Sequence, residues 1–262
     1  MDQQLIRQIK DWVEYFRELG IEDFYSRAQP AEIRPGPGAA PVFAAQAPVE
    51  APRLTAASPS PSPLSLFEAP PEPLPAKKQE SLAEIRADLG DCQRCKLWKA
   101  RKHIVFGQGN LRAELVFIGE GPGADEDEQG LPFVGRAGQL LNKMLQLIQI
   151  KREDVYICNV VKCRPPGNRT PEQDEIAACS PFLFRQIESI KPRLICCLGA
   201  PAARTVLGIK EGITKIHGQF YKFGSAKAIA TVHPAYVLRN PREETILRDD
   251  FAKIRDFLKS AS

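Results

Sequence analysis

The sequence contains no long apolar run and no leader-like start. None of its hydrophobic stretches approaches the roughly 18 residues that a membrane-spanning helix needs, and residues 1–4 do not begin a basic region followed by an apolar core. We therefore expect no membrane span and no secretory signal. A strong charge of either sign is also absent, because the net charge is +4 and the pI about 8.6. This mildly basic balance permits a polyanionic partner without requiring one.

Cysteine is plentiful by comparison, but its number is odd. The chain has seven cysteines. Disulfide bonds are not expected in a protein without a secretory signal. Metal binding or burial in a core is therefore the better explanation for these residues.

The composition divides the chain into three parts. Residues 1–28 carry apolar residues at helical spacing and predict one amphipathic helix, which needs a surface to pack on or a partner to bind. Residues 29–80 hold 13 of the 23 prolines, mixed with Ala, Ser and Glu, and predict a disordered linker. Residues 81–262 have the composition of a globular domain and are numerous enough to bury a full core.

Short apolar runs alternate with helical patterns within residues 81–262. This alternation predicts an α/β fold, in which helices cover both faces of a mainly parallel sheet. The expected buried strands are 114–119, 155–161, 193–199 and 228–232, and residues 219–223 are expected to add an edge strand or hairpin. The expected helices are 81–90, 137–150, 170–191, 200–207 and 241–259.

The longest of these helices has clear signals at its start and a proline inside it. Thr170 is the expected N-cap and Pro171 the first helical residue. Acidic Glu172 and Asp174 favour this end of the helix dipole. Pro181 is expected to bend or break the helix.

A glycine-rich segment follows the first expected strand. It reads Gly-Glu-Gly-Pro-Gly-Ala-Asp-Glu-Asp over residues 119–127, and Phe133 lies shortly downstream. Glycine lets the backbone approach a ligand closely, and open α/β sheets bind ligands beyond the carboxyl ends of their strands. We therefore expect Glu120 and Phe133 at a binding site. Taken alone, the segment is explained equally well as an ordinary strand-to-helix turn with surface acids.

Four of the cysteines have the arrangement of a metal centre. Cys92 and Cys95 form a Cys-x-x-Cys pair, and Cys163 and Cys179 lie far downstream. Four thiolates from two regions can close on either zinc or an iron–sulfur cluster. Zinc sites usually show two short-spaced pairs, so the single pair favours a [4Fe–4S] cluster. The other three cysteines lie in expected strands and are interpreted as core residues.

The second expected strand ends in polar residues. Asn159 interrupts an apolar run, and a buried carboxamide needs hydrogen-bond partners. It is either a structural side chain bonded to backbone or a reader of a nucleobase, because a carboxamide offers a donor and an acceptor. Residues 162–169 form a rigid basic loop, which is either a phosphate contact through Arg164 and Arg169 or a solvated turn.

The last expected strand is followed by His233, at the same sheet edge as Glu120 and Asn159. A histidine that shares an edge with two other polar residues is more often catalytic than a solitary one. Leu238 and Arg239 lie on an expected loop a few residues later. An apolar wedge beside a phosphate contact is a device that opens a base stack.

Together these motifs resemble the family 4 uracil-DNA glycosylases, the iron–sulfur enzymes of the uracil-DNA glycosylase superfamily. The resemblance covers roughly residues 82–258 and rests on five motifs in the family's order. Besides the four cysteines, the motifs are residues 119–123, 132–138, 159–169 and 233–239.

The resemblance implies a three-layer α/β/α sandwich with a four-stranded, mainly parallel sheet, and one [4Fe–4S] cluster on the four cysteines of the metal motif. It also implies hydrolysis of the N-glycosidic bond of deoxyuridine in DNA, which releases uracil and leaves an abasic site. Phe133 then stacks on the flipped uracil, Asn159 hydrogen-bonds its polar edge, and His233 stabilises charge developing on uracil O2. Glu120 positions or polarises water, or stabilises the sugar cation. Gly121 lines the pocket where family 1 enzymes carry an aspartate.

Such an enzyme binds uracil-containing DNA, single- or double-stranded, through the basic loop and the Leu238–Arg239 pair. We expect a monomer in the bacterial cytoplasm, associated with the nucleoid, and a protein partner is one explanation of the N-terminal helix. The alternative is a non-catalytic iron–sulfur or zinc module that binds DNA in replication or repair. A third reading is an electron carrier. The binding module does not need Glu120, Asn159 and His233 together, and an electron carrier does not need the basic loop or residues 233–239.

Overall fold

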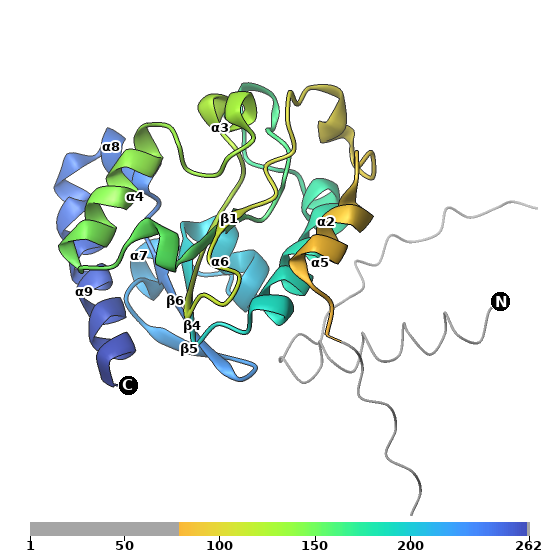
Figure 1. The fold of residues 1–262 in the computed structure, drawn as a ribbon. Coiled ribbons are helices and arrows are strands. Elements are labelled where there is room, and N and C mark those ends of the chain that lie inside the picture. Colours follow the sequence, from red (N-terminus) through yellow and green to blue (C-terminus); the bar gives the residue numbers. More distant parts are fainter. Residues whose placement is uncertain (1–78, 261–262) are drawn as a thin grey trace, which may run out of the picture. The chain divides into compact units, whose positions relative to one another are not determined.

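The computed structural model describes residues 79–260 (Figure 1). The expected helix over residues 1–28 and nearly all of the expected linker over 29–80 lie outside the described residues. None of the described helices combines the length and apolar character that a membrane crossing requires.

A six-stranded sheet forms the centre, in the order β1-β3-β2-β4-β6-β5. The expected parallel core of four strands is confirmed by the pairing of β3 with β2, β2 with β4, and β4 with β6. Two further strands pair antiparallel at the edges: β5 confirms the edge strand expected over residues 219–223, whereas β1 was not expected and brings the four-stranded sheet implied by the resemblance to six strands. The strands are β1 (Gln108–Gly109), β2 (Leu115–Gly119), β3 (Tyr156–Asn159), β4 (Leu194–Leu198), β5 (Phe220–Phe223) and β6 (Ala226–Thr231).

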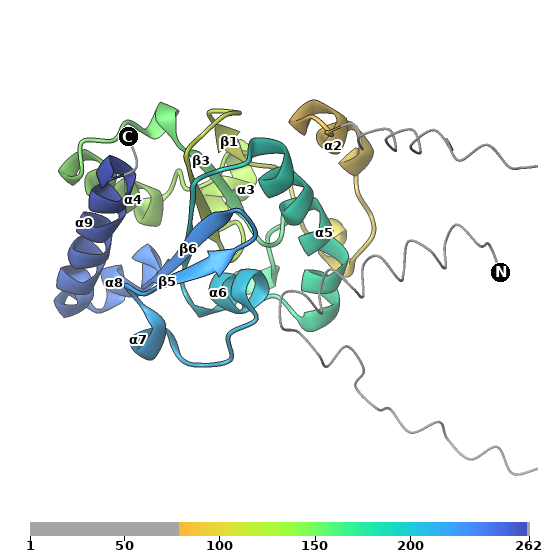
Figure 2. The same cartoon turned by 90° about the horizontal axis from the view of Figure 1, so that it is seen from below.

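Helices cover both faces of this sheet, as expected (Figures 1 and 2). One face carries α2 (Leu82–Leu89), α5 (Gln173–Ile190) and α6 (Ala200–Leu207), and the other carries α4 (Arg136–Leu147), α8 (Pro234–Arg239) and α9 (Glu244–Ser260). The five expected helices agree with the observed ones to within three residues at each end. The shorter helical elements are η1 (Lys96–Lys99), α3 (Ala124–Gln129), η2 (Arg152–Asp154), η3 (Pro166–Asn168), α7 (Ile213–Ile216) and η4 (Pro241–Glu243).

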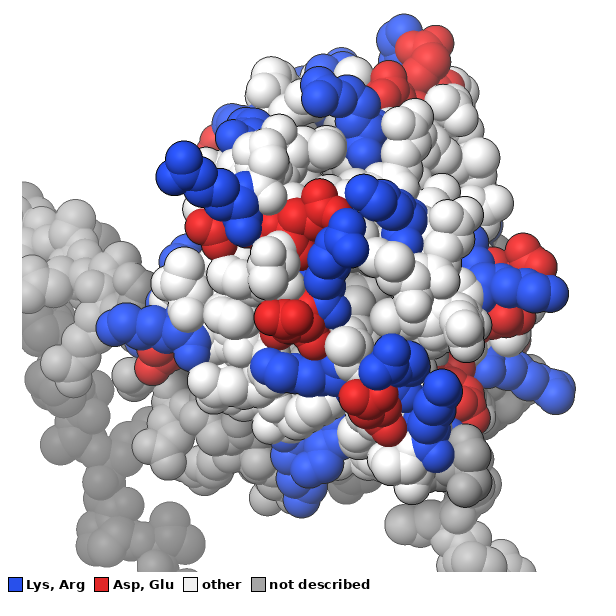
Figure 3. Space-filling model, turned by 90° about the vertical axis from the view of Figure 1, so that its left-hand side faces the viewer, with Lys and Arg blue, Asp and Glu red and all other residues white. Residues whose placement is uncertain are grey.

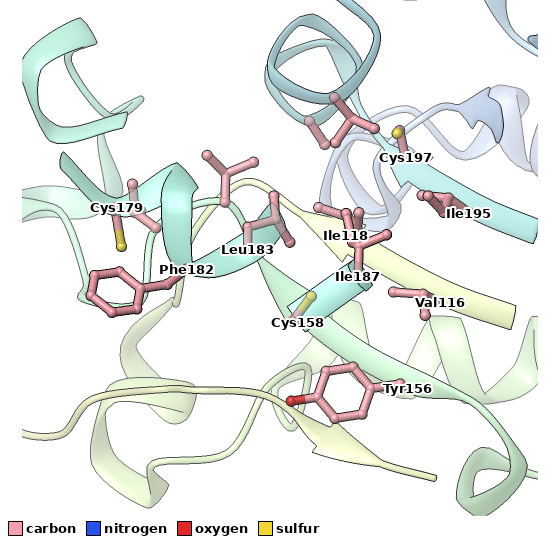
Figure 4. Close-up of a cluster of buried hydrophobic side chains, with 14 of the residues drawn as sticks. Val116, Ile118, Tyr156, Cys158, Cys179, Phe182, Leu183, Ile187, Ile195 and Cys197 are labelled. Atoms are coloured by element: carbon pink, nitrogen blue, oxygen red, sulfur yellow. The ribbon is translucent and has the colours of Figure 1, made fainter. Parts of the chain in front are cut away.

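Both faces of the central strands are buried. Val116 and Ile118 of β2 join the cluster under α2, α5 and α6, whereas Leu115 and Phe117 join the cluster under α4 and α9. This follows from the alternation of side chains along a strand. Figure 4 shows the first cluster, in which α5 packs against β2 and β3. The cysteines expected in the core have no exposed surface: Cys158, Cys196 and Cys197.

The start of α5 differs from the expectation. Thr170 is not the N-cap. That position is taken by Glu172, whose backbone N–H donates to the Glu175 carboxylate at 2.7 Å. The helix also continues through Pro181 without a break. Phe182, the next residue, is buried in the core, and the free energy gained by burying this side chain offsets part of what a proline costs inside a helix.

Candidate active site

A pocket of about 440 Å³ lies beyond the carboxyl ends of the parallel strands. Glu120 follows β2, Asn159 ends β3, and His233 comes shortly after β6. The register pairs Gly119 with Asn159, so these two strand ends lie side by side. The structure brings together all five residues that the sequence placed in a substrate pocket: Glu120, Gly121, Phe133, Asn159 and His233.

Gly119 allows two of these side chains to meet at the end of β2. A Cβ atom at this position would lie 2.4 Å from Oδ1 of Asn159 and 2.7 Å from the ring of Phe133. Real Cβ atoms do not make such contacts, so a side chain at position 119 displaces both groups. Phe133 and Asn159 are themselves almost fully buried, with 5% and 1% of their surface exposed.

The carboxamide of Asn159 has an acceptor to spare. Among the described residues, its Oδ1 is the one buried side-chain nitrogen or oxygen without a hydrogen-bond partner. A buried acceptor without a donor is costly, and this one lines the pocket. Oδ1 of Asn159 therefore lacks the bond to backbone that a purely structural role would require. This atom is available to an N–H group of a ligand.

His233 is held as a neutral donor. It is the N-cap of α8, and its Nδ1 accepts a hydrogen bond from the backbone N–H of Ala235 at 3.1 Å. The proton of the neutral ring is therefore assigned to Nε2. Burial, aided by the charge of Arg239, lowers the pKa of His233 from its usual 6.5 to about 4. The ring consequently carries no charge near pH 7 and can donate from Nε2.

Glu120 is a half-buried carboxyl group. Burial raises its pKa, and a hydrogen bond to the side chain of Thr170 partly counters this. Thr170 is therefore a partner of Glu120, which is a different role from the expected N-cap. Gly121, the residue after Glu120, packs against the segment that follows β3. A Cβ at Gly121 would lie 2.9 Å from Cγ2 of Val161.

The expected basic loop is less available to an outside partner than its sequence indicated. Arg169 donates two hydrogen bonds to the carboxylate of Glu175, at 2.9 and 2.7 Å. Arg164 donates to Oδ1 of Asn168 at 2.8 Å. Lys162 is only 1% exposed. Its assignment to a phosphate-contacting loop is wrong, because the side chain continues the buried run of β3 into the core.

The expected wedge lies on a helix. Leu238 and Arg239 form the last turn of α8, so the expected loop is wrong at this point. Both residues are exposed, and 36% of the surface of Leu238 is accessible. Figure 3 shows basic and acidic side chains interspersed on the face that carries α4, α8 and α9. That face has no continuous basic field.

The four cysteines of the metal motif come from three parts of the fold. Cys92 and Cys95 follow α2, Cys163 follows β3, and Cys179 lies in α5. Burial raises the pKa of Cys163 to about 12, and the neighbouring Cys179 and Cys95 add to this effect. Burial also raises the pKa of Cys179, with Cys95 and Cys92 contributing. Each of the four sulfur atoms therefore lies close enough to at least two others, which for Cys163 are Cys95 and Cys179, to affect a thiol pKa.

N–H groups approach three of these sulfur atoms. Such donors stabilise a thiolate, as they do around metal-bound cysteines. The pairs are Nη1 of Arg94 with Cys92 at 3.5 Å, Nη1 of Arg101 with Cys163 at 3.4 Å, and the backbone N–H of Lys162 with Cys179 at 3.3 Å.

A site for a single metal ion is not formed by these residues. Within residues 79–260, no three His, Cys, Asp or Glu side chains converge closely enough to hold one ion. Thiolates on one zinc ion lie only about 3.8 Å apart, since each Zn–S bond is about 2.3 Å long.

Comparison with known proteins decides the family. The model of the uracil DNA glycosylase superfamily matches residues 106–259. The chain belongs to this superfamily. A type-4 uracil-DNA glycosylase of Saccharolobus solfataricus is 46% identical over 190 residues, which cover 69% of this chain and 88% of the relative. The type-4 enzyme of Thermotoga maritima is 49% identical over 186 residues, covering 69% and 97%. That of Archaeoglobus fulgidus is 45% identical over 183 residues, covering 67% and 92%.

The resemblance to type-4 enzymes is thus confirmed. The superfamily match spans the strands that carry Glu120, Asn159 and His233, and it begins after Cys92 and Cys95. The three-layer α/β fold of a uracil-DNA glycosylase superfamily member agrees with the observed architecture.

Three residues around this glycosylase pocket are not among the sequence-predicted site residues. Lys162 donates to the backbone carbonyl of Asn159, Glu126 accepts from backbone N–H groups of two loops, and Arg152 donates to Pro132. A signal existed for Glu126, which stands three residues after Gly123 as in a capping box. Arg152 carries no sequence signal, because its partner lies 20 residues away.

Proposed function

We propose that this protein removes uracil from DNA by hydrolysing the N-glycosidic bond, which leaves an abasic site for further repair. The observation that carries this proposal is the unpartnered Oδ1 of Asn159 in a pocket at the carboxyl edge of the sheet. The type-4 names of its relatives agree with this function.

The Asn159 carboxamide explains a preference for uracil over cytosine. Uracil carries a hydrogen on N3, which donates to Oδ1 of Asn159. Cytosine has a lone pair at N3, so two acceptors would face each other in a buried site. A pocket built to bond a donor rejects an analogue that lacks it strongly, because the protein group is left unpaired.

His233 and Glu120 lie at opposite ends of the charge separation that the reaction creates. The bond between C1′ and N1 breaks with its electron pair remaining on uracil, and negative charge spreads to O2. Nε2–H of His233 donates to O2, and a neutral imidazole does so without a prior proton loss. Positive charge develops on the sugar, where the Glu120 carboxylate stabilises it or orients the water. The water oxygen then bonds to C1′, and its proton passes to the uracil anion or to solvent.

Base access requires a flipped nucleotide, because the reacting atoms of a paired base are not exposed to a pocket. We assign Leu238 as the wedge that enters the stack, with Arg239 beside it as a phosphate contact. Arg164 and Arg169 belong to the loop after β3, and we assign them as further phosphate contacts, which they make once they exchange part of their bonds to Asn168 and Glu175 for phosphate. The face in Figure 3 carries charges of both signs, which favours a few specific phosphate contacts over a broad electrostatic surface.

We further infer that Cys92, Cys95, Cys163 and Cys179 hold one [4Fe–4S] cluster. Besides burial, neighbouring sulfur atoms of this set raise the pKa of Cys95, Cys163 and Cys179, and N–H donors approach three of the four. Four cysteine thiolates are the usual ligand set of such a cluster. Its role here is structural: it ties the segment after α2 to β3 and α5, which carry the Asn159 side of the pocket.

The same proposal describes a monomer that acts on single- or double-stranded DNA, at the nucleoid of the bacterial cytoplasm. The alternative of a non-catalytic iron–sulfur module keeps the fold and the cysteines. It gives no reason for the unpartnered Asn159 oxygen beside a neutral His233.

The test measures uracil release from a labelled oligonucleotide, with an absorption spectrum near about 400 nm on the same sample. Wild-type protein and Asn159→Ala are compared, with Asn110→Ala as the control because Asn110 is exposed and does not line the pocket. Release by the wild type and the control, but not by Asn159→Ala, supports the enzyme. A brown protein that binds the DNA and frees no base supports the binding module instead.

A further inference from the structure

Phe133 has an unfavourable backbone conformation. Its φ is 50°, in the left-handed region that bulky residues rarely adopt. Its carbonyl oxygen also lies against α4, because a Cβ at Gly138 would be only 1.8 Å from it. A strained conformation at a functional site persists only where neighbouring groups enforce it. The groups that enforce this one are therefore relevant to the pocket.

Glu126 holds the backbone on the carboxyl-terminal side of Phe133. Oε1 of Glu126 accepts hydrogen bonds from the backbone N–H groups of Val134 and Gly135, both at 2.9 Å. Oε2 accepts from the N–H of Gly123 at 3.1 Å. Gly123 is the last glycine of the glycine-rich segment that carries Glu120, and it caps α3. One carboxylate thus joins the two loops that form opposite parts of the pocket.

Arg152 holds the backbone on the amino-terminal side of Phe133. Its Nη2 donates to the carbonyl oxygen of Pro132 at 2.6 Å, and its Nη1 donates to Oδ1 of Asn142 in α4 at 2.9 Å. Arg152 does not line the pocket, whereas Glu126 does. Both oxygens of Glu126 are nevertheless engaged by backbone N–H groups.

We propose that Glu126 and Arg152 are positioning residues, which act on uracil binding through Phe133. They fix the residues on either side of it and so hold the strained backbone that places its ring against Gly119 and Asn159. The ring then lies 5.7 Å from that of His233, measured between centroids. This inference rests on the proposed function, in which Phe133 stacks on the flipped base.

A double-mutant cycle tests whether Glu126 and Arg152 act through Phe133. Glu126→Gln and Arg152→Gln are each measured alone and in a Phe133→Ala background, by single-turnover uracil release and by inhibition with free uracil. We expect each single variant to lose roughly 10- to 100-fold in rate and to bind uracil more weakly. In the Phe133→Ala background the same changes have little further effect, because the group they position is gone. The pH profile of the rate stays as in the wild type.

The matched control is Glu128→Gln, since Glu128 is on the same helix, is exposed and pairs with Lys102. Additive effects in the Phe133→Ala background overturn the proposal. A large effect of Glu126→Gln without one of Arg152→Gln also overturns it, and instead makes Glu126 a direct substrate contact.

A second readout needs neither activity nor DNA. The aromatic ring of Phe133 shifts the NMR resonance of the His233 ring, and histidine-labelled protein reports this shift. Glu126→Gln and Arg152→Lys are expected to move the His233 resonance, whereas Glu128→Gln leaves it in place. If the wild type releases no uracil but the resonance moves, the proposed function fails while the positioning role stands. If the resonance stays in place in folded variants, the positioning role is wrong.

Discussion

The ammonium group of Lys162 donates a hydrogen bond to the carbonyl oxygen of Asn159, at 2.8 Å, from a side chain that is almost fully buried. The same group donates to Oε1 of Gln186 in α5 at 2.6 Å. Gln186 in turn donates to the carbonyl oxygen of Phe106 and to the hydroxyl oxygen of Tyr156, at 3.0 and 3.2 Å. This buried chain of polar groups ties the Asn159 end of β3 to the helix that carries Cys179.

Lys162→Met is expected to destabilise the protein by about 2 to 4 kcal/mol, because two buried acceptors lose their donor. Urea unfolding at pH 7 measures the loss. Lys222→Met is the control, since Lys222 is exposed on β5 and its replacement is expected to have little effect. Equal stability of the two variants would show that Asn159 and Gln186 find other donors.

His233 gives the stability a defined pH dependence. Its pKa is about 4 in the folded protein and about 6.5 when unfolded, so between these values the unfolded chain binds more protons. The contribution of neutral, buried His233 to the free energy of unfolding is therefore fully present above pH 6.5 and is lost as the pH falls toward 4. At pH 5 the loss is about 2 kcal/mol.

The measurement compares the free energy of unfolding at pH 7 and pH 5 for the wild type and His233→Gln. The variant is expected to lose less stability over this interval. Only the difference between the two pH values is used, because the substitution also removes the cap of α8. Parallel pH curves for the two proteins would contradict the lowered pKa.

Gly119→Ala is expected to lower uracil release more than about 100-fold while the protein still folds and binds DNA. The added methyl displaces the Asn159 carboxamide and the Phe133 ring together. Single-turnover release and DNA binding are measured in parallel. Gly212→Ala is the matched control, because a Cβ there meets nothing closer than 3.9 Å and the φ of −69° suits alanine. Uracil release by Gly119→Ala at the wild-type rate would mean that activity does not depend on the present positions of Asn159 and Phe133.

Cys163→Ala is expected to abolish the absorption near about 400 nm that a bound cluster gives. Cys197→Ala is the control, since Cys197 is also buried but lies in β4, outside the metal motif. The control is expected to lose stability through its cavity and to keep its colour. Retention of the full spectrum by Cys163→Ala would remove this residue from the cluster.

The sequence predicted the parallel core because its apolar runs are long and regular. It also located Glu120, Asn159 and His233, because residues at strand ends share one edge of such a sheet. Short elements were less accessible. The two residues of β1 have no apolar pattern, and α8 was mistaken for a loop because its six residues contain both a proline and exposed side chains.

Partnerships between distant residues were not predictable. Lys162 stands in a basic stretch of sequence that is typical of a DNA-contacting loop. Its side chain is buried because Gln186 in α5 supplies an acceptor for the ammonium group inside the core. Likewise, Thr170 has the preferred chemistry of an N-cap. The alternative bond of Glu172 to Glu175 within the first turn, and the position of Glu120 nearby, give Thr170 another role.

The pocket draws its walls from strands that are spread along the chain, and the last of them, β6, pairs in the interior of the sheet. Thr231 at its end is held by a hydrogen bond from its hydroxyl group to Asp250 of α9, at 2.7 Å. The wall of the pocket that follows β6 therefore depends on a helix that contributes none of its lining residues. Shortening the chain by α9 would remove the partner of Thr231 and expose one face of the sheet without touching the pocket directly.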